Sequence, residues 1–283
     1  MAGCLTLLGT KGGPAVRQGG PNPTSSVLEL GGKVIIVDCG LGVTRALVEA
    51  GIDLKTLGYI FITHLHSDHI LELGPLLHTA WTSGLATPVQ VFGPKGTRAY
   101  WQAFLASMQF DIDIRLADEG RPNLVEFVRI TEHTEGPVLR EPGLTVSALR
   151  VDHPPVTDCF ALKFETGNKR IVFSADTAYF PPLADFASGA DVLVHEAMLN
   201  EGVERLVART GNGARLKQHL LNSHTLVEDA IKIARDAGVK HLYLHHLVPA
   251  DDPEITLEYW DDYVHALWDG PVTVGRDGLK ITL

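Results

Sequence analysis

The chain has few cysteines, no long apolar stretch and a shortage of positive charge. Its three cysteines, Cys4, Cys39 and Cys159, are too few and too scattered for a disulfide framework, and they fit a reducing compartment. No apolar run reaches the roughly 18–20 residues that span a bilayer, and the first residues do not form a basic and then apolar leader. We therefore expect a cytoplasmic protein with no membrane partner.

The charge balance argues against one class of partner. With 24 basic and 34 acidic residues the formal net charge is −10, which disfavours a broad electrostatic grip on nucleic acid but leaves a local basic patch open. The chain is instead rich in histidine, with 13 residues, and this directs attention to metal chemistry. At 283 residues, 45% hydrophobic and 20% charged, it can form one soluble domain over residues 1–283.

Strand-type apolar runs alternate with helical patterns along the chain. Residues 26–40 predict two strands joined by a turn at Gly31-Gly32, and 57–63 predict a buried strand. Residues 96–108 and 224–238 predict amphipathic helices, the second opened by a capping box of Thr225 and Glu228. The order of elements fits an α+β fold, an αββα sandwich of two mixed sheets flanked by helices. Periodicity alone also allows a doubly wound α/β sheet.

The stretch FITHLHSDHI, residues 61–70, places three histidines and an aspartate directly after the buried strand. Residues two apart in an extended segment point the same way, so His64 and His66 can share one ion. Asp68 and His69 can then reach a second ion, which indicates two metals that each need further ligands. The alternatives are a structural zinc site and a chance histidine-rich loop, but no cysteine lies nearby.

This cluster resembles the His-x-His-x-Asp-His signature of the metallo-β-lactamase superfamily, matched by His64, His66, Asp68 and His69. The resemblance implies ligands after later strands, and RVDHPP, VFSADT and LYLHHL offer His153, Asp176 and His246, with His245 as the second choice. By that analogy His64, His66 and His153 hold one ion, Asp68, His69 and His246 hold the other, and Asp176 bridges them. Asp38 in VDCG would support the ligands through hydrogen bonds.

Two further stretches indicate which branch of the superfamily the chain resembles. VLVHEAML and SHTLVEDAIKIA are similar to loops of the ribonuclease Z-like and arylsulfatase-like members, with Glu196 and His224 at the matching positions. The resemblance implies a hydrolase in which a metal-bridged hydroxide cleaves an ester-type bond: a carboxylic ester, lactone, phosphodiester or sulfate ester. Asp68 would hold a metal and accept a proton, and His224, held by Glu196, would protonate the departing oxygen. The ions expected are zinc, with manganese or iron as alternatives.

The segment between His153 and Asp176 decides our expectation for the substrate. It has room for two strands and a turn but not for the tRNA-binding arm of ribonuclease Z. We therefore expect a small organic substrate, with nucleic acid unlikely, and keep a ribonuclease Z-like tRNA 3′ endonuclease as the alternative. A single-iron oxygenase and a binding module with an inactive site are less favoured, and the resemblance suggests a homodimer.

The surroundings of the site are less defined by sequence. The glycine-rich loops over residues 10–22 are expected at the rim of the site. Residues 111–142 and 200–222 are candidate lid segments. Five aromatic residues belong either to the core or to an apolar pocket: Trp81, Tyr100, Trp101, Phe104 and Phe110.

Overall fold

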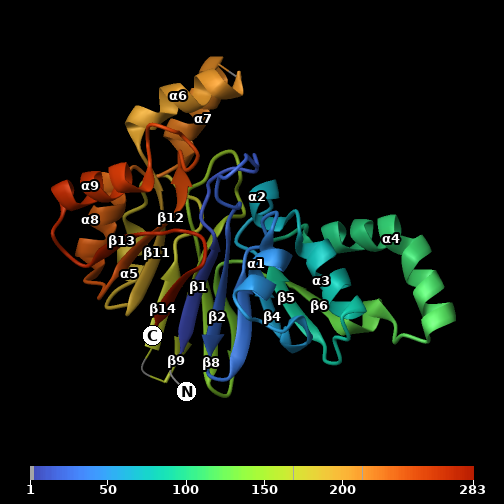
Figure 1. Ribbon diagram of the computed structural model, residues 1–283. Coiled ribbons are helices and arrows are strands. Elements are labelled where there is room, and N and C mark those ends of the chain that lie inside the picture. The colour runs from blue at the N-terminus through green and yellow to red at the C-terminus, as the bar shows by residue number, and fades with distance from the viewer. Residues whose placement is uncertain (1–2, 168, 212) are drawn as a thin grey trace.

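Two seven-stranded β-sheets lie face to face in the computed structural model, which describes residues 3–167, 169–211 and 213–283 (Figure 1). The first sheet has the order β14-β1-β2-β3-β4-β5-β6. Its strands are β1 (Cys4–Gly9), β2 (Ser25–Leu30), β3 (Lys33–Val37), β4 (Tyr59–Phe61), β5 (Val89–Gly93), β6 (Val128–Glu132) and β14 (Leu279–Thr282).

The second sheet comes mostly from the C-terminal half of the chain and has the order β13-β12-β11-β10-β9-β8-β7. Its strands are β7 (Gly136–Glu141), β8 (Leu144–Arg150), β9 (Phe160–Thr166), β10 (Lys169–Phe173), β11 (Val192–Met198), β12 (Leu242–Val248) and β13 (Val272–Val274). Both sheets are mixed. The first is antiparallel from β14 to β3 and parallel from β3 to β6. The second is antiparallel from β7 to β10 and parallel from β10 to β13.

Helices cover the outer face of each sheet (Figure 1). The connections between strands of the first sheet contain α1 (Val43–Glu49), α2 (Ser67–Ile70), α3 (Leu73–Thr82) and α4 (Thr97–Glu119), with short 3₁₀ turns at Leu54–Thr56 and Leu124–Phe127. The second carries α5 (Pro182–Phe186), α8 (Val227–Ala237) and α9 (Leu257–Leu267). The hairpin of α6 (Asn200–Thr210) and α7 (Gly213–Ser223) projects at the end of the sandwich away from both termini.

The core divides into layers as this arrangement requires. Apolar side chains between the sheets, such as Leu28 and Phe164, form one cluster. A second cluster lies between the first sheet and its helices, and a third between the second sheet and its helices. Four layers with three apolar interiors are the αββα sandwich that the sequence predicted.

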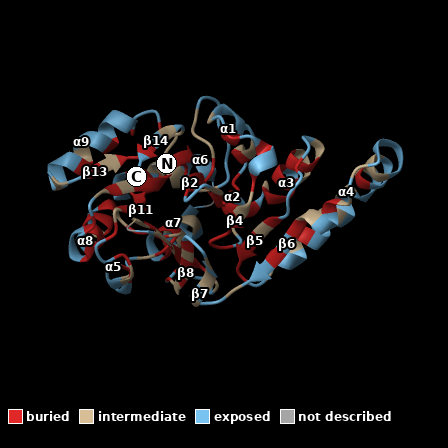
Figure 2. Ribbon diagram, turned by 90° about the horizontal axis from the view of Figure 1, so that it is seen from below, coloured by how far each residue is buried: buried red, intermediate tan, exposed pale blue. Residues whose placement is uncertain are grey.

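The first candidate lid segment takes part in the scaffold. Residues 111–119 continue α4, and the remainder includes the 3₁₀ turn at Leu124–Phe127 and the strands β6 and β7, which are edge strands of the two sheets. Figure 2 shows α4 extending away from the sandwich with much of its length exposed. None of the described helices combines the length and the apolar character needed to cross a bilayer.

The predicted capping box at Thr225 is wrong. Helix α8 begins at Val227 after Leu226, without a side-chain cap. The Thr225 hydroxyl instead donates to the Thr177 carbonyl at 2.6 Å. This bond joins the loop that carries His224 to the loop that carries Asp176. Thr225 therefore holds two loops of the site together and does not cap helix α8.

Candidate metal centre and active site

The candidate residues lie at one end of the sandwich because the strands that carry them end or bend there. Asp38 directly follows β3, the histidine cluster follows β4, and His153 and Asp176 follow β8 and β10. Glu196 and His246 lie within β11 and β12, which pair in parallel with a register shift directly after Glu196. The carboxyl ends of parallel strands meet at one edge of a sheet, so residues far apart in sequence converge.

The first group of metal-type side chains combines His64, His66, His153 and Asp176. One donor atom from each lies within 4.8 Å of all the others. His153 Nε2 is 3.1 Å from His66 Nδ1. Asp176 Oδ2 is 3.7 Å from His64 Nε2 and 3.9 Å from His153 Nε2. Such spacing suits side chains around a common centre.

The second group combines Asp68, His69, His246 and again Asp176, within the same 4.8 Å limit. His246 Nε2 lies 3.1 Å from Asp176 Oδ2 and 3.3 Å from Asp68 Oδ2. His69 Nε2 lies 3.3 Å from Asp176 Oδ1. The structure thus brings all seven predicted ligands together, with Asp176 common to both groups. Their roles as ligands stay a prediction.

The environment of these side chains fits metal ions. Four of the buried polar atoms that have no hydrogen-bond partner among the described residues belong to this cluster: His64 Nε2, His69 Nε2, Asp176 Oδ1 and His246 Nδ1. Burial lowers the pKa of His66 to about 4 and that of His64 well below its ordinary value, so both rings are neutral, the form that binds metals. Burial opposes a charge on His69 and His246, but Asp176 and Asp68 outweigh it and raise the pKa of both rings well above the ordinary value. The buried carboxylates thus call for positive charge beside them, which divalent cations also supply.

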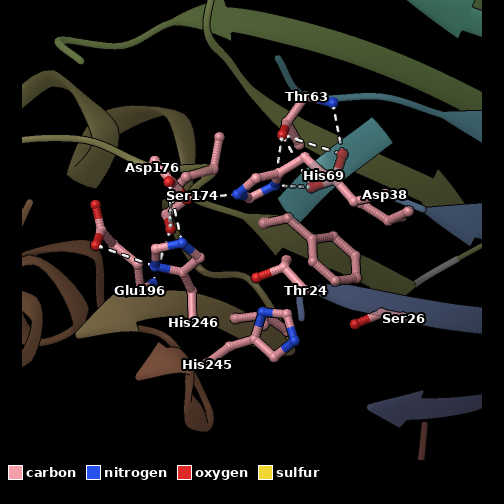
Figure 3. A pocket seen from close by; sticks show the side chains of 14 residues that line it. Thr24, Ser26, Asp38, Thr63, His69, Ser174, Asp176, Glu196, His245 and His246 are labelled. Atoms are coloured by element: carbon pink, nitrogen blue, oxygen red, sulfur yellow. Dashed lines mark hydrogen bonds and ion pairs between the residues drawn. The ribbon is translucent and has the colours of Figure 1, made fainter. Parts of the chain in front are cut away.

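Asp38 supports this cluster from behind. Its Oδ2 accepts a hydrogen bond from His69 Nδ1 at 2.8 Å, and its Oδ1 accepts from the Thr63 backbone N–H at 2.8 Å (Figure 3). The first bond leaves His69 Nε2 free to face Asp176. A carboxylate on the far nitrogen fixes the tautomer and orientation of a ligating histidine, so this geometry suits the supporting role of Asp38, which stays a prediction.

Backbone strain is concentrated in the same place. Asp38, Ala175 and His246 have φ angles of 63°, 57° and 45°, in the left-handed region that side chains with a Cβ rarely adopt. Each such residue costs about 1–3 kcal/mol. The strain is retained where it positions a carboxylate or an imidazole of the cluster.

Adjacent histidines on β12 have different surroundings. Figure 3 shows the His246 ring between Asp176 and Glu196. The His245 Nε2 instead pairs with the Gly9 carbonyl at 2.8 Å, and burial lowers the pKa of His245 to about 3. The geometry therefore favours His246 over His245 as the residue that faces the cluster.

Glu196 and His224 form a pair beside the second group. Glu196 Oε2 is 2.8 Å from His224 Nδ1, and its Oε1 accepts from the Thr177 backbone N–H at 2.5 Å. Burial lowers the pKa of His224, but the charge and hydrogen bond of Glu196 outweigh burial and raise it above the ordinary value. A histidine that keeps its proton beside a buried carboxylate is suited to act as a general acid.

The loop at residues 11–13 closes one side of the centre. The Gly13 backbone N–H donates to Asp68 Oδ2 at 2.8 Å. A Cβ at Gly12 would lie 2.5 Å from Val248 Cγ2 and 2.8 Å from His246 Cε1. Gly12 is therefore required so that the backbone can approach His246 closely.

Replacing Gly12 with alanine should displace either His246 or the Gly13 N–H that holds Asp68. We expect a loss of about 10–100-fold in activity and metal affinity, the range for lost support of a metal ligand. Gly58→Ala is the control, because a Cβ there meets only the Val34 carbonyl oxygen at 3.8 Å. Equal activity and metal affinity in the two variants would show that the close approach is unimportant.

A cavity of about 430 Å³ opens onto the centre, and its lining includes His66, Asp68, Asp176 and His224. Residues 11–15 and Arg17 line this cavity, which confirms the predicted place at the rim for the first part of the glycine-rich loop. Residues 19–21 line a different cavity. The α6–α7 hairpin contributes Leu206, Leu216, His219 and Leu220. Sequence reasoning did not single out Lys11, Arg17 or His219, and no motif in the chain would have found them.

The aromatic residues considered for a pocket have other surroundings. Trp81 and Trp101 are buried in the core between the first sheet and its helices, and Tyr100 and Phe104 pack against that core. Phe110 is 80% exposed on α4. The apolar side chains of the cavity wall are aliphatic, among them Leu206, Leu216 and Val248.

Known proteins resemble the chain over nearly its whole length. The sequence profile of the family described as Anti-Pycsar protein Apyc1 matches residues 4–210. A protein of Mycobacterium bovis named ribonuclease Z is 32% identical over 276 residues, 96% of this chain and 95% of that protein. Another ribonuclease Z, from Mycobacterium sp. strain KMS, is 35% identical over 252 residues, 88% of this chain and 85% of that protein.

Solved structures share the fold. The metallo-β-lactamase fold protein YhfI of Bacillus subtilis superposes with a TM-score of 0.71 at 21% identity, covering 99% of both chains. The short form of human tRNase Z gives the same score and identity over 99% of this chain and 98% of that one. Zinc-bound PqqB of Methylobacterium extorquens gives 0.69 at 16% identity, over 99% of this chain and all of that one.

The fold, the site and the relatives named ribonuclease Z together define a hydrolase with the metallo-β-lactamase fold and a potential dinuclear metal centre. The chain is ribonuclease Z-like within that superfamily, as its sequence motifs indicated, and belongs to the family of the anti-Pycsar protein Apyc1.

The expectation that nucleic acid is an unlikely partner is wrong. Relatives that match almost the whole chain at 32–35% identity are named ribonuclease Z. The expectation rested on the net charge and on the short connection between His153 and Asp176. Net charge is a sum over the whole surface, however, and Lys11 and Arg17 line the cavity despite it. The length of one connection likewise says nothing about other surfaces that could bind RNA.

Proposed function

We propose that this protein is a dinuclear metal-dependent phosphodiesterase that cleaves RNA, in the manner of a tRNA 3′ endonuclease. The observation that carries the proposal is the Glu196–His224 pair, placed against the two metal-type groups. Glu196, His224 and His246 offer donor atoms within 4.8 Å of one another. A proton donor beside a metal centre suits a substrate whose departing oxygen is strongly basic, as in RNA. The relatives named ribonuclease Z support the same substrate class.

Two sets of side chains would hold the ions: His64, His66 and His153 with Asp176, and Asp68, His69 and His246 with Asp176. Imidazole and carboxylate donors without cysteine suit zinc, and also manganese or iron. We infer zinc. When bound, the ions would polarise the phosphate and lower the pKa of the attacking water.

Side chains of the protein would then transfer the protons of the reaction. Asp68, whose Oδ2 accepts a hydrogen bond from the Gly13 N–H at 2.8 Å, would accept a proton from the attacking water. His224 donates a proton to the departing oxygen while Glu196 fixes its orientation, with 2.8 Å between Glu196 Oε2 and His224 Nδ1. One group accepts and the other donates, so each turnover returns the site to its starting charge after proton exchange with solvent.

Basic side chains at the rim suit a phosphate-bearing substrate. Lys11 is 5% exposed and Arg17 lies in the same cavity wall. Both cationic groups face Asp251 Oδ2, at 3.9 Å from Lys11 Nζ and 2.7 Å from Arg17 Nε. Arg209 contacts the same carboxylate, at 3.1 Å from Oδ1, and Lys11 Nζ also donates to the Gly12 carbonyl at 2.9 Å. The exposed Arg17 can therefore reach an anionic ligand in the cavity.

A substrate panel on metal-loaded protein tests this function. It contains a precursor tRNA with a 3′ trailer, the same tRNA without the trailer, bis(p-nitrophenyl) phosphate, a p-nitrophenyl ester and a lactone. We expect removal of the trailer and hydrolysis of the phosphodiester. Turnover of the ester or lactone without cleavage of either phosphodiester would contradict the proposal. Hydrolysis of bis(p-nitrophenyl) phosphate alone would reject RNA as the substrate.

A further inference from the structure

His219 is a histidine beside the centre that belongs to neither metal-type group. It lies on α7, half-buried, and lines the same cavity as His66, Asp176 and His224. Its ring centre is 5.8 Å from that of His224 and 6.3 Å from that of His66. His219 is thus a neighbour of the proposed proton donor, His224, and of the metal-type residue His66.

A chain of hydrogen bonds fixes which nitrogen of His219 carries the proton. The Ser223 hydroxyl donates to the Pro154 carbonyl at 2.5 Å, an oxygen that can only accept. Ser223 Oγ is also 3.3 Å from His219 Nδ1. Because the hydroxyl proton is already used, Ser223 Oγ accepts from His219, and Nδ1 carries the hydrogen. The tautomer is thus assigned from the hydrogen-bond network.

The other nitrogen of His219 is left as a hydrogen-bond acceptor. Within the described residues Nε2 has no hydrogen-bond partner. Burial lowers the pKa of His219, and the neighbouring His224 and His153 lower it further, which agrees with a neutral ring. A neutral acceptor at the wall of the cavity calls for a donor on the substrate, and among ribose groups that donor is a hydroxyl.

We propose that His219 Nε2 accepts a hydrogen bond from the ribose 2′-hydroxyl next to the departing 3′-oxygen, and so selects RNA over DNA. This inference rests on the proposed function. In the reaction, water forms a bond to phosphorus, the bond from phosphorus to the 3′-oxygen breaks, and His224 gives its proton to that oxygen. The 2′-hydroxyl is on the adjacent carbon, so its partner must lie beside His224, as His219 does. His219 exchanges no proton and acts as a positioning residue.

The test compares two RNAs that differ by one atom. One is all-ribose and the other has a 2′-deoxyribose at the nucleotide whose 3′-oxygen departs. For the wild type we expect kcat/KM to be about tenfold higher on the all-ribose RNA, the value of one buried hydrogen bond. The ratio should fall to about one in His219→Phe and recover largely in His219→Gln, whose amide oxygen can accept. Because the ratio is taken within each protein, general damage to the site cancels.

Gln218→Phe is the matched control, because Gln218 is the exposed neighbour on the same helix. Its ratio should equal that of the wild type. An unchanged ratio in His219→Phe, or no preference in the wild type, would overturn the inference and leave the proposed function standing. A wild-type protein that hydrolyses bis(p-nitrophenyl) phosphate but neither RNA would overturn the proposed function and this inference together.

Discussion

Replacing Asp176 with alanine is expected to reduce phosphodiester hydrolysis by at least about 100-fold, beyond the 10–100-fold range for losing a supporting residue. Asp176 is the one side chain common to both metal-type groups. Its Oδ1 faces His69 Nε2 at 3.3 Å and its Oδ2 faces His246 Nε2 at 3.1 Å. Removing Asp176 takes a candidate ligand from both groups at once, whereas removing any other member would take one from a single group. Initial rates at saturating metal measure the effect.

The control for this variant is Asp185→Ala, because Asp185 is an exposed aspartate on α5. It should keep wild-type activity and metal binding. If Asp176→Ala lost less than about tenfold at saturating metal and bound metal as tightly as the wild type, Asp176 would be an ordinary buried carboxylate and the shared-ligand arrangement would be rejected.

Replacing His224 with alanine is expected to affect substrates unequally. Loss of a general acid costs about 100–10,000-fold where the departing oxygen needs a proton. RNA needs one because its departing alkoxide is strongly basic. Nitrophenolate leaves without one, so bis(p-nitrophenyl) phosphate should lose far less. Glu196→Gln should show the same pattern more weakly, because Glu196 acts through its 2.8 Å contact with His224. The ratio of kcat on the two substrates is the measurement.

His265→Ala serves as the histidine control, since His265 is half-exposed on α9. It should change neither rate. Equal losses on RNA and on bis(p-nitrophenyl) phosphate in His224→Ala would mean that His224 organises the site without donating a proton.

Much of the fold could be predicted because its signals are local. The apolar runs before the histidine cluster and before Asp176 are buried strands, β4 and β10, as their composition indicated. The far end of α4 was missed for a reason that is also local. Arg115 pairs with both Asp111 and Glu119 at spacings of four residues, which sustains the helix through a polar stretch. The predicted helix therefore ended at residue 108, and residues 111–119 were assigned to a candidate lid segment.

The site divides into a predictable part and a part that depends on packing. The family resemblance named its candidate ligands, most of which directly follow buried strands, while His246 lies within β12. The cavity wall arises where the α6–α7 hairpin and the loop at residues 11–17 meet over the centre, and no local pattern encodes that contact. Thr225 shows the same limit, because a capping signal was overridden by a partner 48 positions away in sequence, Thr177.

The central claim is that two metal-type groups share Asp176, and the metal content of the purified wild-type protein tests it most directly. After loading with zinc and removal of free metal, elemental analysis should find two ions per chain, with a stoichiometry that falls in Asp176→Ala. One ion per chain, or none, would contradict a dinuclear centre.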